Sequence, residues 1–428
     1  MATTNVFPTT RGRVRVLCAL ATALALAAPI LPPAAIAADC GNTSEGFKAL
    51  TDLGGGTYQG EQGGLYPGGA NKRPSAHTAE GISLAKGQVV PRKANGAVDA
   101  KNGKLVFLSV GMSNTEAEFK EFIKRANADS SKSKRVVVVN GAQKGKEAGE
   151  VAKAERGYWD EVDARLAAAG VTPAQVGAIW MKETDGSPSL PFKEYIAKLE
   201  NDFATIVQIA KDRYPNMWVT YVSTRVYGGY AVTDVSPEPW AYQDGFAAKG
   251  LIERQLSGQL PIGSNAAPWL SWGPYMWADG TKGRADGLKW FCGDFQEDGV
   301  HPSRSGTEKV ANLLLNFLHT DATAKIWYTG GSQSPGSGSP GPVTSPGSSA
   351  TATPGATPGE TPGSGSPTAT GSPSQPPLGA PPLPDDEFPW AALLLLAAPI
   401  VTVVSYRLLR GLPLIPRRRA RPPAGPAA

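Results

Sequence analysis

Three side chains, far apart along this sequence, have the types and spacing that acyl transfer requires. Ser113 follows Gly111 and Met112, and His301 lies three residues after Asp298. A serine hydroxyl is a weak nucleophile and needs a base within hydrogen-bond reach. The three-residue spacing lets the Asp298 carboxylate accept from Nδ1 of His301, which leaves Nε2 to take the proton from Ser113. These residues predict a nucleophilic serine served by a histidine base.

His301 is the best placed of the three histidines in the chain. His77 lies in a Gly-rich stretch, and His319 falls at the end of the last predicted helix, where a histidine tends to satisfy terminal carbonyls. Ser113 lies at a strand-to-helix turn, so its own N–H can face a developing oxyanion. The plainer alternatives are that Ser113 only caps a helix and that residues 298–302 only lead into one.

The elements that must position these residues are short apolar runs that alternate with amphipathic segments. Runs that are apolar throughout indicate buried parallel strands, and ligands bind at the carboxyl ends of such strands. The sequence predicts an α/β domain at 104–330 whose parallel sheet has helices on both faces, preceded by an irregular Gly-rich extension at 38–103. The predicted strands are 104–110, 135–139, 176–181 and 217–223, and the predicted helices are 116–128, 150–168, 191–213 and 307–319.

Two of these segments resemble motif blocks of the SGNH hydrolase superfamily, the GDSL-like lipases and esterases. Residues 111–114, in which Ser113-Asn114 follows a residue other than aspartate, are similar to the nucleophile block of the acetylxylan and sialate O-acetylesterase branch. Residues 298–302 are similar to the final block of the superfamily. The resemblance covers roughly 104–320. It implies a three-layer flavodoxin-like fold with Ser113 as nucleophile, His301 as base and Asp298 as the residue that orients it.

The resemblance also implies an oxyanion hole. The loop 142–145 resembles the block whose backbone N–H completes that hole beside Ser113, with Gly145 as the first choice of donor and Gly141 as the second. The third block departs from the family, because Met181 and Lys182 replace its amide and glycine. Glu183 matches the branch's glutamate, which can share in orienting the histidine. Lys182 then supplies positive charge or blocks the site; the alternative is that Lys182 and Glu183 form a surface ion pair of little energetic weight.

Five residues are candidates for substrate binding: Asn114, Lys182, Arg225, Trp272 and Tyr275. Arg225 follows the fourth predicted strand and could pair with a substrate carboxylate or with Glu183. The two aromatic residues belong to the second of two aromatic stretches, 227–242 and 269–290, which Gly and Pro interrupt and which we expect to form loops. Aromatic faces in such loops can stack on sugar rings. The alternative for any one of them is an aromatic core beneath long loops.

Both ends of the chain have the patterns of membrane targeting. Residues 1–37 carry three arginines, an apolar run and an A-x-A site, which predicts a cleaved signal peptide rather than an uncleaved anchor. The apolar run 388–406 would rise about 28 Å as a helix, enough to cross most of a bilayer core. Acids precede it and the basic tail 407–428 follows it, so the tail is expected in the cytoplasm and the domain outside. The alternative for this run is a buried core helix.

Composition limits the remaining possibilities. Residues 331–387 consist mainly of Gly, Ser, Pro, Thr and Ala and are expected to form a disordered stalk. Residues 38–330 carry 33 Lys and Arg against 33 Asp and Glu, which argues against nucleic-acid binding. Removal of the signal leaves Cys40 and Cys292, which favours one disulfide over two separate thiols. The lack of clustered Cys and His disfavours a structural metal site.

The leading hypothesis is a serine esterase that is anchored at the cell surface and acts outside the membrane. It would remove an O-acyl group, with acetyl as the first candidate, from a carbohydrate or cell-envelope polymer or a small ester, with no cofactor. One alternative is a non-catalytic glycan-binding or adhesion module on the same fold, which the altered third block favours. The other is an O-acyltransferase or a lipase-like enzyme.

Overall fold

The computed structural model describes residues 37–330, apart from 156 and 265, and its centre is a five-stranded parallel sheet. The strand order is β4-β3-β5-β6-β7, so β3, the first of these strands in the sequence, lies second in the sheet. Every residue of β3, β5, β6 and β7 is buried, as expected of parallel strands covered on both faces. The strands are β3 (Leu105–Gly111), β4 (Val136–Asn140), β5 (Val176–Lys182), β6 (Val219–Ser223) and β7 (Trp269–Trp272).

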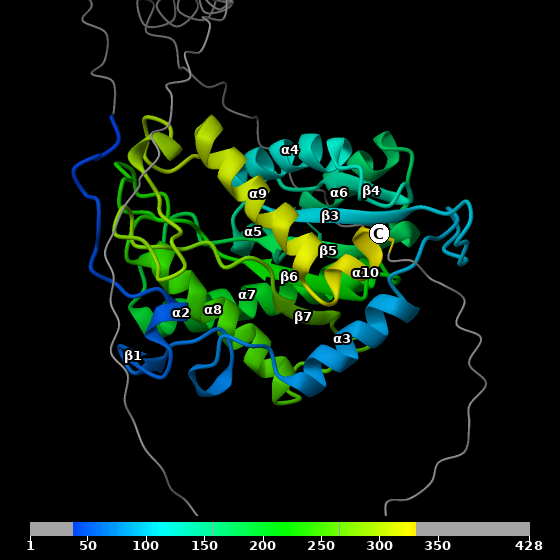
Figure 1. Ribbon diagram of the computed structural model, residues 1–428, viewed down its shortest axis with the longest axis horizontal. Helices are drawn as coiled ribbons and strands as arrows, with labels where there is room; N and C mark the ends of the chain where they lie inside the picture. Colours follow the sequence, from blue (N-terminus) through cyan, green and yellow to red (C-terminus); the bar gives the residue numbers. More distant parts are fainter. Residues whose placement is uncertain (1–36, 156, 265, 331–428) are drawn as a thin grey trace, which may run out of the picture. The chain divides into compact units, whose positions relative to one another are not determined.

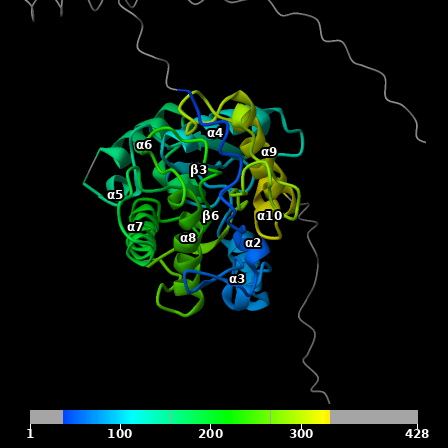
Figure 2. The ribbon, with the colours of Figure 1, turned by 90° about the vertical axis from the view of Figure 1, so that its left-hand side faces the viewer.

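Two groups of helices cover the two faces of this sheet (Figure 1; Figure 2). The fold is therefore the three-layer, flavodoxin-like α/β arrangement that the sequence predicts. One face carries α3 (Ser75–Gly87), α4 (Ser113–Ala128), α9 (Arg304–Thr320) and α10 (Ala324–Tyr328), and the other carries α5 (Ala148–Val151), α6 (Tyr158–Ala168), α7 (Phe192–Arg213) and α8 (Trp240–Leu256).

The N-terminal extension is more regular than its glycine content suggests. It contains a short helix, a two-stranded ribbon and the 13-residue helix α3, so the prediction of an irregular segment is wrong for α3. Gly81 lets α3 lie directly on the Trp269 ring, because a Cβ at Gly81 would overlap that ring. His77 of the same helix is buried and bonds the Leu270 carbonyl at 2.8 Å. The smaller elements are α2 (Leu50–Leu53), β1 (Thr57–Tyr58) and β2 (Glu61–Gln62).

Two further segments differ from the sequence prediction. The segment predicted as one helix over 150–168 is two helices, α5 and α6, and the described residues between them, 152–155 and 157, are not helical. The stretch predicted as aromatic loops contains α8 and β7, so Trp240 and Tyr242 lie on a helix and Trp272 on a strand. Eleven of the 17 residues of α8 have small or polar side chains, and even Gln243, Asp244 and Lys249 are buried, so the helix lacks the usual polar face.

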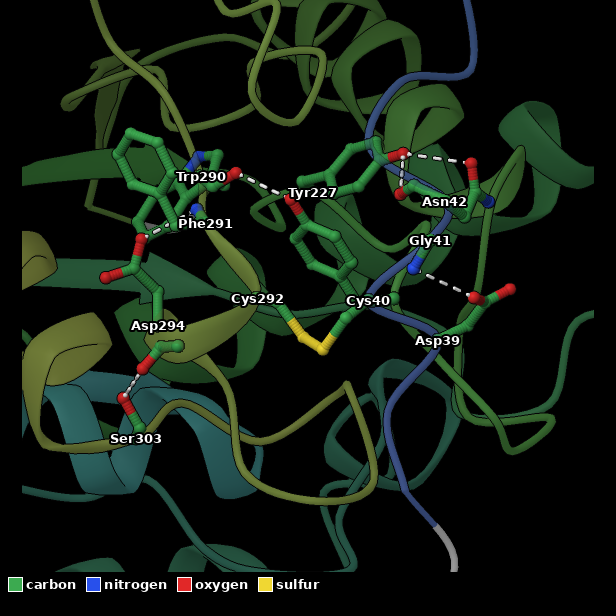
Figure 3. The surroundings of a disulfide bond; sticks show 12 residues. Asp39, Cys40, Gly41, Asn42, Tyr227, Trp290, Phe291, Cys292, Asp294 and Ser303 are labelled. Carbon is green, nitrogen blue, oxygen red and sulfur yellow. Dashed lines mark hydrogen bonds between the residues drawn. A yellow bond between two sulfur atoms is a disulfide. The ribbon is translucent and has the colours of Figure 1, made fainter.

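A disulfide joins the start of the described chain to the loop that precedes Asp298. Cys40 and Cys292 are bonded across 252 residues, with their Cα atoms 5.3 Å apart, as the cysteine count predicts (Figure 3). Nearby backbone contacts continue the attachment, because Asp39 N–H donates to the Tyr230 carbonyl and Tyr227 OH donates to that of Asn42. The extension is thus fastened to the loop that carries the candidate base and to the segment that follows β6.

The predicted signal segment 1–37 lies outside the described residues except for its last residue, and the predicted stalk, membrane helix and tail at 331–428 lie outside them entirely. Among the helices of the described part, none has the length and apolar character needed to cross a membrane.

Candidate active site

Ser113 stands where β3 passes into α4. The strand is buried as far as Gly111, and the extended residue Met112 is the N-cap of the helix. Ser113 is the first helical residue, so its N–H belongs to the first turn, where no carbonyl of the same helix can accept it. Gly111 is required at the strand end, because a Cβ there would overlap the Lys182 carbonyl of β5. The hydroxyl is thereby held at the carboxyl edge of the sheet.

The loop 296–302 holds the base by a dense set of local hydrogen bonds. Oδ1 of Asp298 accepts from the backbone N–H groups of Val300 and His301, each at 2.9 Å. Gly299 has φ +66°, and a Cβ there would overlap the Tyr230 carbonyl, so the turn favours glycine. The backbone of Gln296 then donates to the His301 carbonyl at 2.8 Å. The carboxylate and the imidazole are therefore fixed relative to each other before any ligand binds.

These two loops meet in space. Nε2 of His301 lies 2.9 Å from Oγ of Ser113, and Nδ1 lies 2.6 Å from Oδ2 of Asp298. With the imidazole proton on Nδ1, the histidine donates to Asp298 and accepts from the Ser113 hydroxyl. The side chains of His301 and Asp298 are 34% and 31% exposed, so the group lies at the solvent edge. We refer to Ser113, His301 and Asp298 as the triad.

The electrostatics of Asp298 suit an orienting carboxylate. Partial burial opposes its ionisation, but the hydrogen bonds from the His301 side chain and from the Val300 and His301 N–H groups outweigh this, and the pKa of Asp298 is held below its ordinary value. Asp298 is thus charged at neutral pH and can stabilise an imidazolium that forms during proton transfer.

A pocket of about 240 Å³ opens beside Ser113, between the loops that follow β4, β5 and β6. Gly145 lines it, has φ +66° and donates no backbone hydrogen bond within the described residues, so its N–H is available beside that of Ser113. Gly141 is not, because its N–H already donates to Oγ of Ser109 at 3.2 Å. The geometry thus favours the first of the two predicted glycine donors for an oxyanion. We refer to this space as the site pocket.

Asn114 lines the site pocket, but its side-chain amide is committed elsewhere. The residue is buried, and Nδ2 donates to the Val300 carbonyl at 2.9 Å. This bond ties the first turn of α4 to the loop that carries Asp298 and His301. Asn114, predicted as a substrate-binding residue, thus joins the two segments that carry the triad.

The third block is arranged differently from the prediction. Lys182 is fully buried and pairs with Glu118 of α4 at 2.9 Å, so it neither reaches the site pocket nor forms a surface pair with Glu183. Glu183 is also fully buried and accepts from the Thr184 N–H at 3.1 Å, and the structure gives it no hydrogen bond to His301. Burial raises the pKa of Glu183 well above its ordinary value, which favours the neutral acid. Glu118, the partner of Lys182, gave no sequence signal beyond its place in a helix.

The other predicted substrate residues divide between core and pocket. Trp272 and Tyr275 are buried against the N-terminal extension, where Trp272 Nε1 donates to the Leu65 carbonyl at 2.6 Å and Tyr275 OH accepts from the Leu50 N–H at 3.2 Å. Neither lines the site pocket, so the core alternative describes them. Arg225 does line it, and it is also buried.

Fold and side chains together define an α/β protein with a serine, a histidine and an aspartate in hydrogen-bond sequence at the carboxyl edge of a parallel sheet. No family model matches the sequence, and no curated protein matches it.

Solved structures do show similarity. A protein of Bacteroides fragilis, provisionally assigned as an acylhydrolase, is 11% identical with a TM-score of 0.31 and covers 57% of this chain and 97% of its own. The protein YxiM of Bacillus subtilis is 13% identical with a TM-score of 0.30, covering 52% and 58%. A gut microbial enzyme that metabolizes diltiazem is 14% identical with a TM-score of 0.31, covering 56% and 49%. At such scores the chemistry of this chain must rest on its own side chains.

Proposed function

We propose that this protein is a serine esterase that cleaves O-acyl esters, with Ser113 as nucleophile, His301 as general base and Asp298 as the orienting carboxylate. The observation that carries the proposal is the unbroken pair of hydrogen bonds, 2.9 Å and 2.6 Å, through residues 188 positions apart in the chain. Chance seldom brings a serine, an imidazole and a carboxylate into this order beside a pocket that also holds unpaired backbone N–H groups. The motif blocks that resemble SGNH hydrolases coincide with these residues.

The reaction follows from the geometry. Nε2 of His301 takes the proton of Ser113 as Oγ attacks the ester carbonyl, and the resulting oxyanion accepts from the N–H groups of Ser113 and Gly145. The protonated His301 then gives its proton to the departing alcohol. A water molecule, activated by the same histidine, cleaves the acyl-serine and releases the acid.

The proposal places this chemistry outside the cell, on an acetylated carbohydrate or cell-envelope polymer. The apolar segments and flanking arginines at both ends of the sequence support export and anchoring. The disulfide between Cys40 and Cys292 is compatible with an oxidising compartment.

The test is hydrolysis of 4-nitrophenyl acetate by the purified protein and by Ser113→Ala, with Ser131→Ala, an exposed serine outside the pocket, as the matched control. Loss of the nucleophile should lower kcat by about 10⁴-fold or more, while the control keeps its activity. Turnover by Ser113→Ala at the wild-type rate would exclude the mechanism. Product analysis with a sugar acceptor present separates hydrolysis from acyl transfer, since only a transferase would form the acylated sugar.

A further inference from the structure

Arg225 is a buried cation that lines the site pocket and has no hydrogen-bond or ion-pair partner among the described residues. It follows β6 by two residues, is 1% exposed, and lines the same pocket as Ser113. Within the described part of the chain its guanidinium makes no hydrogen bond, and Nε and Nη2 are buried without any acceptor. A buried charge normally persists only when it is paired, so this arrangement needs an explanation.

The acids whose charges act on Arg225 make their hydrogen bonds to other groups, although Oδ2 of Asp244 has no partner among the described residues. Glu118 pairs with Lys182 at 2.9 Å, and Oδ1 of Asp244 accepts from the Tyr195 hydroxyl at 2.5 Å. Glu238 accepts from Trp277 Nε1 at 2.7 Å and from two backbone N–H groups.

These acids act on Arg225 only through space, and burial weakens their charge. Burial raises the pKa of both Asp244 and Glu238 to about 7, so each is only partly ionised at neutral pH. The guanidinium therefore keeps an unused capacity to bind an anion.

The geometry of the group and the size of the pocket define what would fill it. A guanidinium presents a planar fork of donors that matches a carboxylate, and such pairs are stronger when water is excluded. The pocket of about 240 Å³ contains both Ser113 and Arg225, so one small molecule can reach both.

We propose that Arg225 is a specificity-determining residue that binds a carboxylate carried by the ester itself, so that the site prefers acidic esters to neutral ones. This inference rests on the proposed esterase function and names its substrate class. The carboxylate can belong to the acyl part, as in a hemiester of a dicarboxylic acid, or to the alcohol part, as in an O-acylated uronic acid. Both present the same group to Arg225.

The test compares kcat/KM for matched acidic and neutral esters in the full-length protein. One pair is 4-nitrophenyl hydrogen succinate and 4-nitrophenyl acetate; the other is an O-acetylated methyl glucuronoside and the corresponding O-acetylated methyl glucoside. We expect wild type to prefer the acidic member of one pair, which identifies the part that carries the carboxylate. In Arg225→Met that preference should fall by about 30-fold or more, as expected when one partner of a buried charged contact is removed. Arg225→Lys, which keeps the charge without the fork, should restore part of it.

Lys146→Met is the matched control, since Lys146 is a half-buried cation on the lining of the same pocket. If the subsite is specific, Lys146→Met should change the preference for acidic over neutral esters by less than about 3-fold, because a partly exposed charge is screened by water. Equal effects of Lys146→Met and Arg225→Met would show general electrostatic attraction and overturn the inference.

Folding and catalysis are controlled separately. Arg225→Met should melt at or above the wild-type temperature, because it removes an unpaired buried charge. A lower melting temperature with an unchanged preference would show a structural role and overturn the inference. Should Arg225→Met fail to fold, Arg225→Lys and Arg225→Gln supply the same ratio of kcat/KM between acidic and neutral esters.

Failure of this inference and failure of the proposed function give different results. Turnover of neutral esters with no acidic preference, or with one that Arg225→Met leaves unchanged, removes the carboxylate subsite and keeps the esterase. The opposite outcome combines two observations: wild type shows no turnover, and calorimetry shows that the acidic ester binds to Ser113→Ala but not to Ser113→Ala/Arg225→Met. That outcome keeps the subsite and removes the esterase.

Discussion

Two regions of this molecule gather polar side chains but differ in how their polar groups are paired. In the triad, each side chain has a hydrogen-bond partner, and Asp298 accepts three bonds through its two oxygens. The second region, which we term the buried charged cluster, consists of five buried ionisable residues whose charges act on one another: Glu118, Lys182, Glu183, Arg225 and Asp244. Within this cluster, Nε and Nη2 of Arg225, Oε1 of Glu183 and Oδ2 of Asp244 lack any hydrogen-bond partner among the described residues.

The difference separates two tasks. A proton relay must be in place before the substrate arrives, since its geometry lowers the reaction barrier only if it needs no rearrangement. A recognition group, in contrast, must keep donors available for a ligand. The triad has the first property and Arg225 the second. The four predictions below test this contrast.

The largest effect is expected from Asp298→Asn. An amide at this position cannot stabilise the imidazolium and can hold the wrong tautomer, so kcat for 4-nitrophenyl acetate should fall by about 10³ to 10⁴-fold with the fold intact. Glu183→Gln is the control that tests whether the other carboxylate predicted to orient His301 contributes. Its carboxyl is buried, favours the neutral form and makes no bond to His301, so its loss should cost less than about 10-fold. A larger loss for Glu183→Gln than for Asp298→Asn would reverse the assignment.

The next effect concerns the one ion pair inside the buried charged cluster. Lys182→Met leaves Glu118 buried without its partner and should lower the free energy of unfolding by about 3 to 5 kcal/mol. The double variant Lys182→Met/Glu118→Leu should recover most of that loss, because both charges are then gone. Urea unfolding of the two variants measures this. A double variant as unstable as the single one would show that the stability of the cluster does not depend on this ion pair.

Asn114→Asp separates positioning from packing. It keeps the shape of the side chain but loses the donor to the Val300 carbonyl, so the loop that carries His301 should shift relative to Ser113. We expect kcat to fall by about 10- to 100-fold while KM changes little, since small displacements of reacting groups have effects of this size. A purely structural bond would lower the unfolding midpoint and leave kcat unchanged, which steady-state kinetics beside a thermal melt would reveal.

The smallest effect is a pH dependence of stability from the buried carboxyls. The folded-state pKa of Asp244 is raised to about 7, so its stabilising contribution is full below the unfolded pKa and is lost as pH rises towards 7. Between about pH 5 and 7 this carboxyl should lower the free energy of unfolding as pH rises, by on the order of 1 kcal/mol per pH unit. Asp298 has the opposite sign, but its contribution changes only below the ordinary aspartate pKa, outside this window. Urea unfolding at pH 5 and 7 should show a flatter dependence in Asp244→Asn, and an identical dependence in both proteins would contradict the pKa shift.

The sequence predicted well those features that depend on local pattern. The four predicted strands are within two residues of β3, β4, β5 and β6, because uninterrupted apolar runs mark buried parallel strands. The placement of Ser113 and His301 at one edge follows from the same rule, since carboxyl ends of parallel strands share an edge.

The features that the sequence did not predict depend on tertiary contacts. The four-residue strand β7 is completed only by pairing with β6, and α8 buries polar side chains such as Asp244 that hide its helical periodicity. The pairing of Lys182 with Glu118, rather than with the adjacent Glu183, arises because α4 packs on the sheet. No spacing in the sequence carries that information.

The central claim is that Ser113 is a nucleophile activated by His301. Treatment with a fluorophosphonate followed by peptide mass spectrometry tests it most directly, because the reagent bonds to activated serines whatever the natural ester. We predict a single phosphonate adduct on Ser113 in the wild-type protein, and slow or absent labelling in His301→Ala with Ser113 still present. Failure of Ser113 to react, or labelling at the same rate without His301, would contradict the claim.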